Sequence, residues 1–414
     1  MTEPQIITFG CRMNAFESEV MRRNVKQAGL NEAVIINTCT VTAEATRQAR
    51  QSIRRARRER PRAKIIVTGC AAQLDPESFA SMPEVDRVLG NAEKLDAANF
   101  GADLDERVLV NDIMSVTENA GHLIDGFDGR ARAFVQIQNG CDHRCTFCII
   151  PFARGPSRSV ARGAIVAQVQ QLVENGYNEV VLTGVNITDY GRDLPGAPSL
   201  SHLIESLLAQ VPNLKRLRLS SIDPVDVDAR LIDLLGNQPR LMPHLHLSLQ
   251  AGDDMVLKRM KRRHTRTDAI KTCEKIRNLR PDTVFGADLI AGFPTESDAM
   301  FENSLRLVDD CGLTYLHVFP YSVRPGTPAA KMPQTPGPIA KARAAKLRAA
   351  GTRALQTYLD RQTGTETDVL METDHGGRTP QFAGIKFAEA QTAGAIVRAR
   401  VLGRKENTLL GVTL

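Results

Sequence analysis

The chain of 414 residues is long enough for two or three domains, and its hydrophobic content of 42% is enough to build their cores. The net charge of +6 is compatible with an anionic partner, and no apolar run approaches the roughly 18 residues that a membrane span requires. Eight cysteines and an N-terminus without a targeting pattern indicate a cytoplasmic protein, whose thiols serve metals or catalysis rather than disulfides.

Residues 1–125 repeat a unit of apolar strand, cysteine and helix. Strand-like runs at 6–9, 34–36 and 65–67 each lead to a cysteine and then to a helical segment. This alternation predicts a parallel sheet with helices on its faces, and ligands of such sheets gather at the carboxyl ends of the strands. The alternative is three small buried residues in tight turns. The topology favours a meeting of the three thiols, which are Cys11, Cys39 and Cys70.

Residues 127–345 contain six strand-like runs separated by helical segments. This pattern predicts a partial or full βα barrel, with polar or glycine-rich motifs after every strand, at the face where barrel enzymes build their active sites. The predicted strands are 134–137, 180–182, 216–219, 245–249, 284–290 and 315–319. The predicted helices are 160–175, 199–210, 226–236, 253–279 and 297–311.

A cysteine triplet follows the first of these strands. Cys141, Cys145 and Cys148 have the spacing C-x3-C-x2-C. Three thiolates can hold three irons of a cubane cluster and leave the fourth iron open for a ligand. The alternatives are a structural zinc site, which favours paired cysteines and four ligands, and three unrelated buried thiols. The triplet favours a cluster at the mouth of the barrel.

The last stretch combines a basic helix with short strands. An Ala-rich helix is predicted over 338–360. Strand-like pieces follow at 367–371, 382–387, 395–401 and 409–412, so residues 355–414 are predicted to form a small all-β barrel.

Basic residues gather in several helical segments. Residues 47–62 carry eight arginines, and a second run covers 258–266. A solvated helix surface is the default interpretation of any one run, but together with the basic helix they favour a polyanion. The absence of Trp argues for backbone and shape recognition rather than extensive base stacking. The predicted RNA contacts are Arg47, Arg50, Arg54, Arg58, Lys341 and Arg348.

The cysteine segments resemble those of a known enzyme family. The triplet segment N-G-C-D-H-R-C-T-F-C is similar to the signature of radical S-adenosylmethionine enzymes, and T-F-G-C-R-M-N, I-I-N-T-C-T-V-T and V-T-G-C-A-A-Q resemble motifs of the methylthiotransferases among them. The resemblance covers essentially the whole chain. It implies an α/β protein with an N-terminal parallel sheet domain, a central radical-SAM partial (βα)6 TIM-like barrel and a TRAM-like RNA-binding barrel.

The resemblance also implies two 4Fe–4S clusters and two molecules of S-adenosylmethionine per turnover. Cys11, Cys39 and Cys70 would hold an auxiliary cluster that presents sulfur for methylation, and the triplet would hold the cluster that generates a radical. Phe147 would sit near the adenine of the cofactor. Each of the polar contacts expected at the strand ends could instead cap a helix or satisfy a turn. The expected cofactor contacts are Phe147, Thr183, Gly184, Asn186, Ser220, Ser221, Gln250, Asp288 and Gly292.

Three branches of the family differ in substrate. The loop segments are most similar to the branch that modifies N6-threonylcarbamoyladenosine beside the tRNA anticodon; isopentenyladenosine in tRNA and a ribosomal-protein aspartate are the alternatives. The implied partners are a tRNA anticodon stem–loop and an external, flavodoxin-like electron donor, with the sulfur donor open. An alternative from a different class of protein is a non-catalytic RNA-binding iron–sulfur protein that senses redox state. Cys273 and Cys311 are predicted to be buried structural thiols, and His143 to lie at the surface or behind the ligands.

Overall fold

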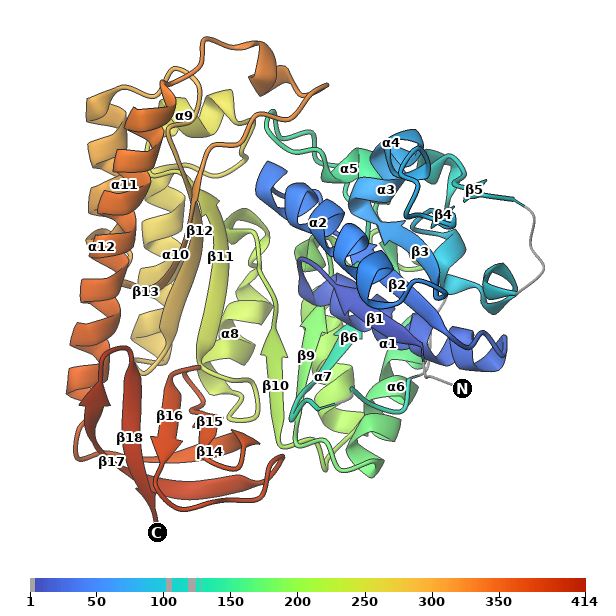
Figure 1. Cartoon of the computed structure of the whole chain (residues 1–414). Coiled ribbons are helices and arrows are strands. Elements are labelled where there is room, and N and C mark those ends of the chain that lie inside the picture. Colours follow the sequence, from blue (N-terminus) through green and yellow to red (C-terminus); the bar gives the residue numbers. More distant parts are fainter. Residues whose placement is uncertain (1–3, 102–105, 118–123, 128) are drawn as a thin grey trace.

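The computed structural model describes residues 4–101, 106–117, 124–127 and 129–414. An N-terminal α/β unit lies beside a central unit of strands and helices, and a small barrel of strands covers one end of the central unit (Figure 1). No helix in the described ranges is long and apolar enough to cross a membrane.

The N-terminal unit is a five-stranded parallel sheet whose strands stand in chain order. Its second strand is buried along its whole length, as expected for a strand covered on both faces. The strands are β1 (Gln5–Thr8), β2 (Ala33–Thr38), β3 (Lys64–Gly69), β4 (Arg87–Leu89) and β5 (Val108–Leu109). The helices are α1 (Arg12–Gln27), α2 (Ala43–Glu59), α3 (Cys70–Leu74) and α4 (Pro76–Ala80).

The central unit has six parallel strands in two sheets, ordered β10-β9-β6 and β11-β12-β13. Parallel bridges from Leu217 to Leu241 and from Ile222 to Leu247 connect the sheets, so the predicted partial barrel is confirmed. The strands are β6 (Ala133–Gln136), β9 (Glu179–Thr183), β10 (Arg216–Leu219), β11 (His244–Gln250), β12 (Val284–Ala291) and β13 (Leu313–Pro320). The short strands β7 (Gln138–Asn139) and β8 (Arg158–Ser159) form a separate pair. The helices are α5 (Ile150–Arg154), α6 (Arg162–Glu174), α7 (Leu200–Gln210), α8 (Ala229–Asn237), α9 (Asp254–Arg259), α10 (Arg266–Leu279), α11 (Asp298–Asp310) and α12 (Gly337–Arg361).

The single helix predicted over 253–279 is wrong, because α9 and α10 are separate. Lys261 has a φ of 57°, which the helical conformation does not allow. Thr265 then starts α10 with a capping box, in which its hydroxyl accepts from the Asp268 N–H and the Asp268 carboxylate accepts from the Thr265 N–H.

The C-terminal strands form a closed five-stranded barrel in the order β14-β15-β16-β18-β17. Four strands match the prediction, but β15 was missed. Two of its three residues are glycines, and a Cβ at Gly377 would lie 2.5 Å from the Leu370 carbonyl oxygen. The strands are β14 (Glu366–Thr373), β15 (Gly376–Arg378), β16 (Gly384–Phe387), β17 (Ile396–Lys405) and β18 (Thr408–Thr413).

Candidate functional site

The first group of cysteines lies where three neighbouring strands of the N-terminal sheet end. Cys11 follows β1, Cys39 follows β2, and Cys70 is the first residue of α3 directly after β3. The pairing sets Thr38 level with Gly69, so the last two of these strands end at the same height. The structure thus brings to one sheet edge three thiols that are far apart in the sequence.

The three thiols influence one another electrostatically. Burial raises the pKa of Cys39 to about 11; the N–H of Val41 opposes the shift, and Cys70 and Cys11 add to it. Binding of a metal ion reverses this preference, because a coordinating thiol gives up its proton.

Two glycines make this arrangement possible. Gly10 has a φ of 96°, and a Cβ there would lie 2.7 Å from the sulfur of Cys39. Gly69 has the same φ, and its Cβ would lie 2.4 Å from the Thr38 carbonyl oxygen. Both positions require glycine, because a side chain would collide with the neighbouring cysteine loop.

A buried ion network lies behind this group. Lys94 Nζ and Arg154 Nη1 each lie 2.7 Å from an oxygen of Glu17, and none of the three side chains is more than 2% exposed. Arg154 also donates to the Asn14 side chain at 2.6 Å. Burial opposes the charge of Arg154, but Cys70 and Glu17 outweigh it and raise its pKa. Since Arg154 ends α5 and Glu17 lies on α1, the network joins the two units.

The second group of cysteines lies in the loop between β7 and α5. The Cys141 N–H donates to the Gly155 carbonyl at 3.0 Å, and the Cys148 N–H donates to the Cys145 carbonyl at 3.1 Å. Burial raises the pKa of Cys148 to about 12, and the thiols of Cys145 and Cys141 add to the shift. The loop therefore holds the three sulfurs close enough for the charge of one to affect the ionisation of another.

Both groups fit iron–sulfur clusters with one open iron. Each offers three thiols, and N–H groups contact sulfur in both, as in protein sites where such contacts tune a cluster. These contacts are Val41 N to Cys39 Sγ at 3.4 Å, Asn91 Nδ2 to Cys70 Sγ at 3.8 Å and Arg262 Nη1 to Cys145 Sγ at 3.7 Å.

Two cysteines remain outside these groups. Cys273 and Cys311 are fully buried in the core of the central unit, as predicted. The Cys311 side chain is hydrogen-bonded to Cys273 and raises the pKa of that thiol, with burial acting in the same direction.

One cavity is lined by residues that neighbour cysteines of both groups in the sequence. It has a volume of about 220 Å³, and three of the predicted cofactor residues line it: Phe147, Gln250 and Asp288. Val41 and Thr42, which follow Cys39, line it from the N-terminal unit. The cavity is therefore lined from both the N-terminal and the central unit.

The segment after β9 is held by a residue that the sequence did not single out. Gln138 Oε1 accepts from the N–H groups of Val185 and Asn186 at 3.0 and 2.9 Å. A Cβ at Gly184 would lie 2.8 Å from the Gln138 carbonyl oxygen, so this glycine accommodates the protein's own chain. Thr183, the last residue of β9, is 2% exposed.

The Asn186 side chain and His143 share one carboxylate. Asn186 Nδ2 donates to Asp189 Oδ2 at 2.6 Å, and His143 Nε2 lies 2.8 Å from the same oxygen. His143, a half-buried residue of the cysteine loop, is therefore held by a carboxylate rather than free at the surface.

The remaining cofactor predictions lie at other strand ends. Ser220 is 5% exposed, and its hydroxyl has no hydrogen-bond partner among the described residues; Ser221 is half-buried. A Cβ at Gly292 would lie 2.3 Å from Ala340 Cβ. That glycine is explained by the close approach of α12, not by the cavity.

Two histidines flank Asp288. His246 Nε2 lies 3.0 Å and His317 Nδ1 lies 3.3 Å from Asp288 Oδ1. Burial opposes the ionisation of Asp288, but the hydrogen bonds and charges of the two histidines outweigh it and lower its pKa. Their ligand atoms lie within 4.8 Å of one another, close enough to hold a metal ion. Sequence reasoning missed this cluster because its members come from three strands.

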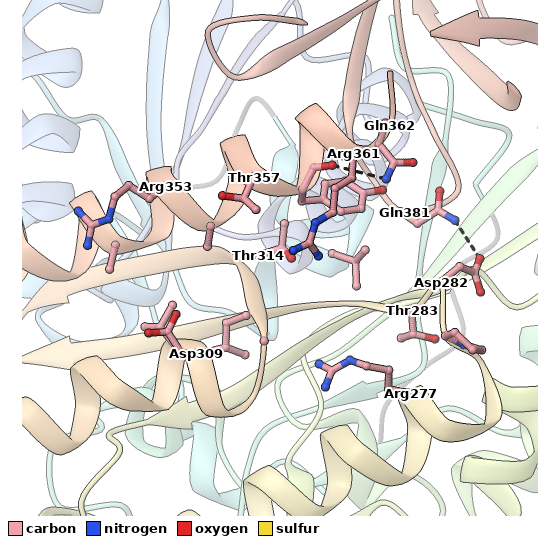
Figure 2. A pocket seen from close by; sticks show the side chains of 18 of the residues that line it. Arg277, Asp282, Thr283, Asp309, Thr314, Arg353, Thr357, Arg361, Gln362 and Gln381 are labelled. Carbon is pink, nitrogen blue, oxygen red and sulfur yellow. Dashed lines mark hydrogen bonds between the residues drawn. The ribbon is translucent and has the colours of Figure 1, made fainter. Parts of the chain in front are cut away.

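A second, larger cavity lies away from both groups of cysteines. It has a volume of about 950 Å³ and is lined by α10, α11, α12 and the C-terminal barrel, from which Gln381 donates to Asp282 (Figure 2). Its charged residues have both signs, and no cysteine lines it.

The residues predicted to contact RNA differ in their exposure and in their contacts within the protein. Arg54 and Arg58 are exposed on α2, and Arg47 is exposed but paired with Glu44. Arg50 is not free to contact RNA as predicted, because its guanidinium donates to the Ser78 hydroxyl at 2.7 Å and lies over the ring of Phe79. On α12, the exposed contacts are Lys341 and Arg348.

Comparisons with family models match two parts of the chain. Residues 135–308 match the Radical SAM superfamily, and residues 4–90 match Uncharacterized protein family UPF0004.

Several curated proteins match the chain over nearly its whole length. It is 51% identical over 402 residues to "Threonylcarbamoyladenosine tRNA methylthiotransferase MtaB" of Rickettsia prowazekii, covering 97% of this chain and 95% of the relative. It is 35% identical to the protein of the same name from Aquifex aeolicus, covering 95% and 98%. It is also 35% identical to "tRNA-2-methylthio-N(6)-dimethylallyladenosine synthase" of Cereibacter sphaeroides, covering 99% and 98%.

Among solved structures, the fold is similar to the radical S-adenosylmethionine methyltransferase TsrM of Kitasatospora setae. The TM-score is 0.54 at 15% identity, covering 77% of this chain and 69% of that one.

Proposed function

The chain belongs to the radical S-adenosylmethionine methylthiotransferase family, and we propose that it methylthiolates C2 of N6-threonylcarbamoyladenosine in tRNA, beside the anticodon. The observation that carries this proposal is the 51% identity to a threonylcarbamoyladenosine enzyme over 97% of the chain. The dimethylallyladenosine relative is less similar, at 35%.

The two groups of cysteines divide the work. Cys141, Cys145 and Cys148 would hold the 4Fe–4S cluster that binds S-adenosylmethionine, and Cys11, Cys39 and Cys70 would hold the auxiliary cluster. When bound, the clusters and two molecules of S-adenosylmethionine per turnover supply the radical and the methylated sulfur. The protein positions the substrate adenine in the cavity that is lined by Val41 and Thr42, close after Cys39, and by Phe147, next to Cys148.

The residues around this cavity orient the ligands and exclude water. Phe147 provides an apolar wall beside the triplet, and Gln250 and Asp288 provide polar atoms at the strand ends. Thr183, Asn186, Ser220 and Ser221 face the same end of the barrel in this proposal. Water exclusion matters because a radical formed in an open site would be quenched.

RNA binding combines two basic helices and the C-terminal barrel. Arg54 and Arg58 on α2, with Lys341 and Arg348 on α12, contact phosphates of the anticodon stem–loop. We assign residues 1–125 to the auxiliary-cluster domain, 127–345 to the radical barrel and 355–414 to a TRAM-like RNA-binding barrel. A flavodoxin-like protein supplies the electron from outside.

Nucleoside analysis of tRNA from a deletion strain tests the substrate. The methylthio group should disappear from threonylcarbamoyladenosine, and the parent nucleoside should accumulate. Complementation by the wild-type chain should restore the product, and complementation by Cys145→Ala should not. Loss of the methylthio group from isopentenyladenosine instead would overturn the assignment.

A further inference from the structure

The loop of the cysteine triplet is held by the residues that end α9. Thr146, which follows Cys145, is 4% exposed, and its N–H donates to the Met260 carbonyl at 3.1 Å. Its hydroxyl donates to the Arg259 carbonyl at 2.7 Å. The last carbonyls of a helix lack partners within the helix, and here the cysteine loop supplies them. The end of α9 is therefore fixed against the loop that carries the sulfurs.

The same helix end fixes the backbone of Arg262. Lys261 has a φ of 57°, in the left-handed region, and its N–H donates to the Lys258 carbonyl at 3.0 Å. The Arg262 N–H donates to the Leu257 carbonyl at 2.9 Å, and the two hydrogen bonds together form a Schellman motif. The Arg262 side chain therefore extends from a defined backbone beside the cysteine loop.

The Arg262 guanidinium contacts a cysteine sulfur. The side chain is 8% exposed, and Nη1 lies 3.7 Å from Cys145 Sγ. Nη2 donates to the Ser248 carbonyl at 2.7 Å and to Asp223 Oδ2 at 2.9 Å, and that aspartate is itself buried. These two acceptors orient the guanidinium, so its contact with the sulfur does not depend on a freely rotating side chain. Arg262 belongs to the basic run 258–266, but it is not part of a solvated surface.

A fixed cation at a cluster ligand favours the arrival of negative charge. Reduction by the external donor adds one electron, breaks no bond and makes a cluster more negative by one unit. Hydrogen bonds to the sulfurs and nearby charges set the reduction potential of such clusters. The charge of Arg262 also reaches Cys148, where burial raises the pKa of the thiol and Arg262 opposes the shift.

On the proposed assignment of a 4Fe–4S cluster to the triplet, we propose that Arg262 acts through Cys145 to raise the reduction potential of that cluster. The guanidinium thereby eases the transfer of the electron from the external donor, while Asp223 and the Ser248 carbonyl hold it in place.

Redox titration followed by electron paramagnetic resonance tests this proposal on the anaerobically reconstituted full chain. The Cys39→Ala background isolates the signal of the triplet, and bound iron is measured in every sample. Arg262→Gln should lower the ratio of reduced to oxidised cluster about tenfold at a fixed potential, which equals a shift of about 59 mV for one electron. Arg262→Lys should keep part of the wild-type potential, because it retains the charge without the fixed fork. Asp223→Asn removes the countercharge but leaves the Ser248 carbonyl as an acceptor, and it should shift the potential in the opposite, positive direction.

The control is Arg263→Gln, which changes the neighbouring, more exposed arginine that pairs with Asp226 and should leave the potential unchanged. An unchanged potential in Arg262→Gln would overturn the proposal, and so would shifts of the same sign in Arg262→Gln and Asp223→Asn. Loss of triplet iron from both Arg262→Gln and Arg262→Lys would also overturn it, by assigning the arginine to assembly of the loop. Weaker S-adenosylmethionine binding at an unchanged potential would overturn it by assigning the guanidinium to the cofactor. The titrations contain no tRNA, so failure of the deletion-strain experiment would refute the substrate and leave this result standing, whereas an unchanged potential in an enzyme active on threonylcarbamoyladenosine would refute only the role of Arg262.

Discussion

The central barrel contacts the N-terminal unit and the C-terminal barrel, and each of these interfaces contains a buried glutamate. The two glutamates differ in the cations that surround them. At the N-terminal unit, Glu17 is held by Lys94 and Arg154, one cation from each unit. At the C-terminal barrel, Glu179 is surrounded by arginines of the central unit itself, with Arg218 Nε at 2.8 Å and Arg132 Nε at 3.1 Å.

The two interfaces also differ in what they adjoin. The Glu17 network contacts the cysteines through Asn91, which accepts a hydrogen bond from Lys94 and donates to the Cys70 sulfur and the Ala153 carbonyl. The Glu179 network instead holds backbone and an aromatic ring: Arg218 donates to the Thr379 and Pro380 carbonyls, and its guanidinium lies 5.1 Å from the ring centre of Phe382. The Glu17 interface therefore helps to position the cysteines, whereas the Glu179 interface attaches the C-terminal barrel to the central unit.

Removing Glu17 should have the largest effect on stability. Glu17→Ala leaves two buried cations without their countercharge and should lower the free energy of unfolding by about 3–5 kcal/mol. Glu59→Ala, which breaks an exposed pair with Arg55, should cost less than about 1 kcal/mol. Denaturant unfolding of both variants measures the difference, and equal costs would contradict the buried network.

Acid should weaken the same interface. Burial opposes the ionisation of Glu17, but Arg154 and Lys94 outweigh it and lower its pKa to about 2. A depressed pKa means that the stabilisation is complete above the unfolded value of about 4.3 and is lost as the pH falls toward 2. The stability difference between wild type and Glu17→Gln should shrink over this range, and a difference that stays constant would count against the ion pair.

Truncating Phe382 should have a smaller effect, confined to the other interface. The ring is half-buried, stacks on His244 and contacts several arginines, so Phe382→Ala should cost about 2 kcal/mol. Hydrogen exchange should rise in the C-terminal barrel, while S-adenosylmethionine cleavage stays at the wild-type rate. Faster exchange around Cys70 instead would show that the interfaces are not independent.

Substitutions of exposed arginines on α2 should have the smallest effect, and that effect should be confined to tRNA binding. Arg54→Ala and Arg58→Ala should each weaken tRNA binding about twofold to fivefold and lower the dependence of log affinity on log salt by about 1. Arg230→Ala, at an exposed pair with Glu205, is the control and should change neither quantity. Unchanged salt dependence in the α2 variants would remove this helix from the RNA surface.

Local patterns predicted the six strands of the central unit and both groups of cysteines, but they missed the short strands β4, β5 and β15. The spacing around Cys145 is local, and three strand-to-cysteine turns follow from parallel topology. The Glu17 network was not predictable, because Lys94 and Arg154 lie far along the chain and only packing brings them to one carboxylate. The break before α10 had a readable signal in the sequence, the capping box of Thr265 and Asp268.

The central claim is that the two groups of cysteines do separable work. The most direct test compares Cys39→Ala with Cys145→Ala, measuring bound iron, 5′-deoxyadenosine and methylthio product in the same reconstituted samples. Cys39→Ala should lose iron and product yet still cleave S-adenosylmethionine, and Cys145→Ala should lose both activities. Full iron content in Cys39→Ala, or product formation by it, would contradict a second cluster at the edge of the N-terminal sheet.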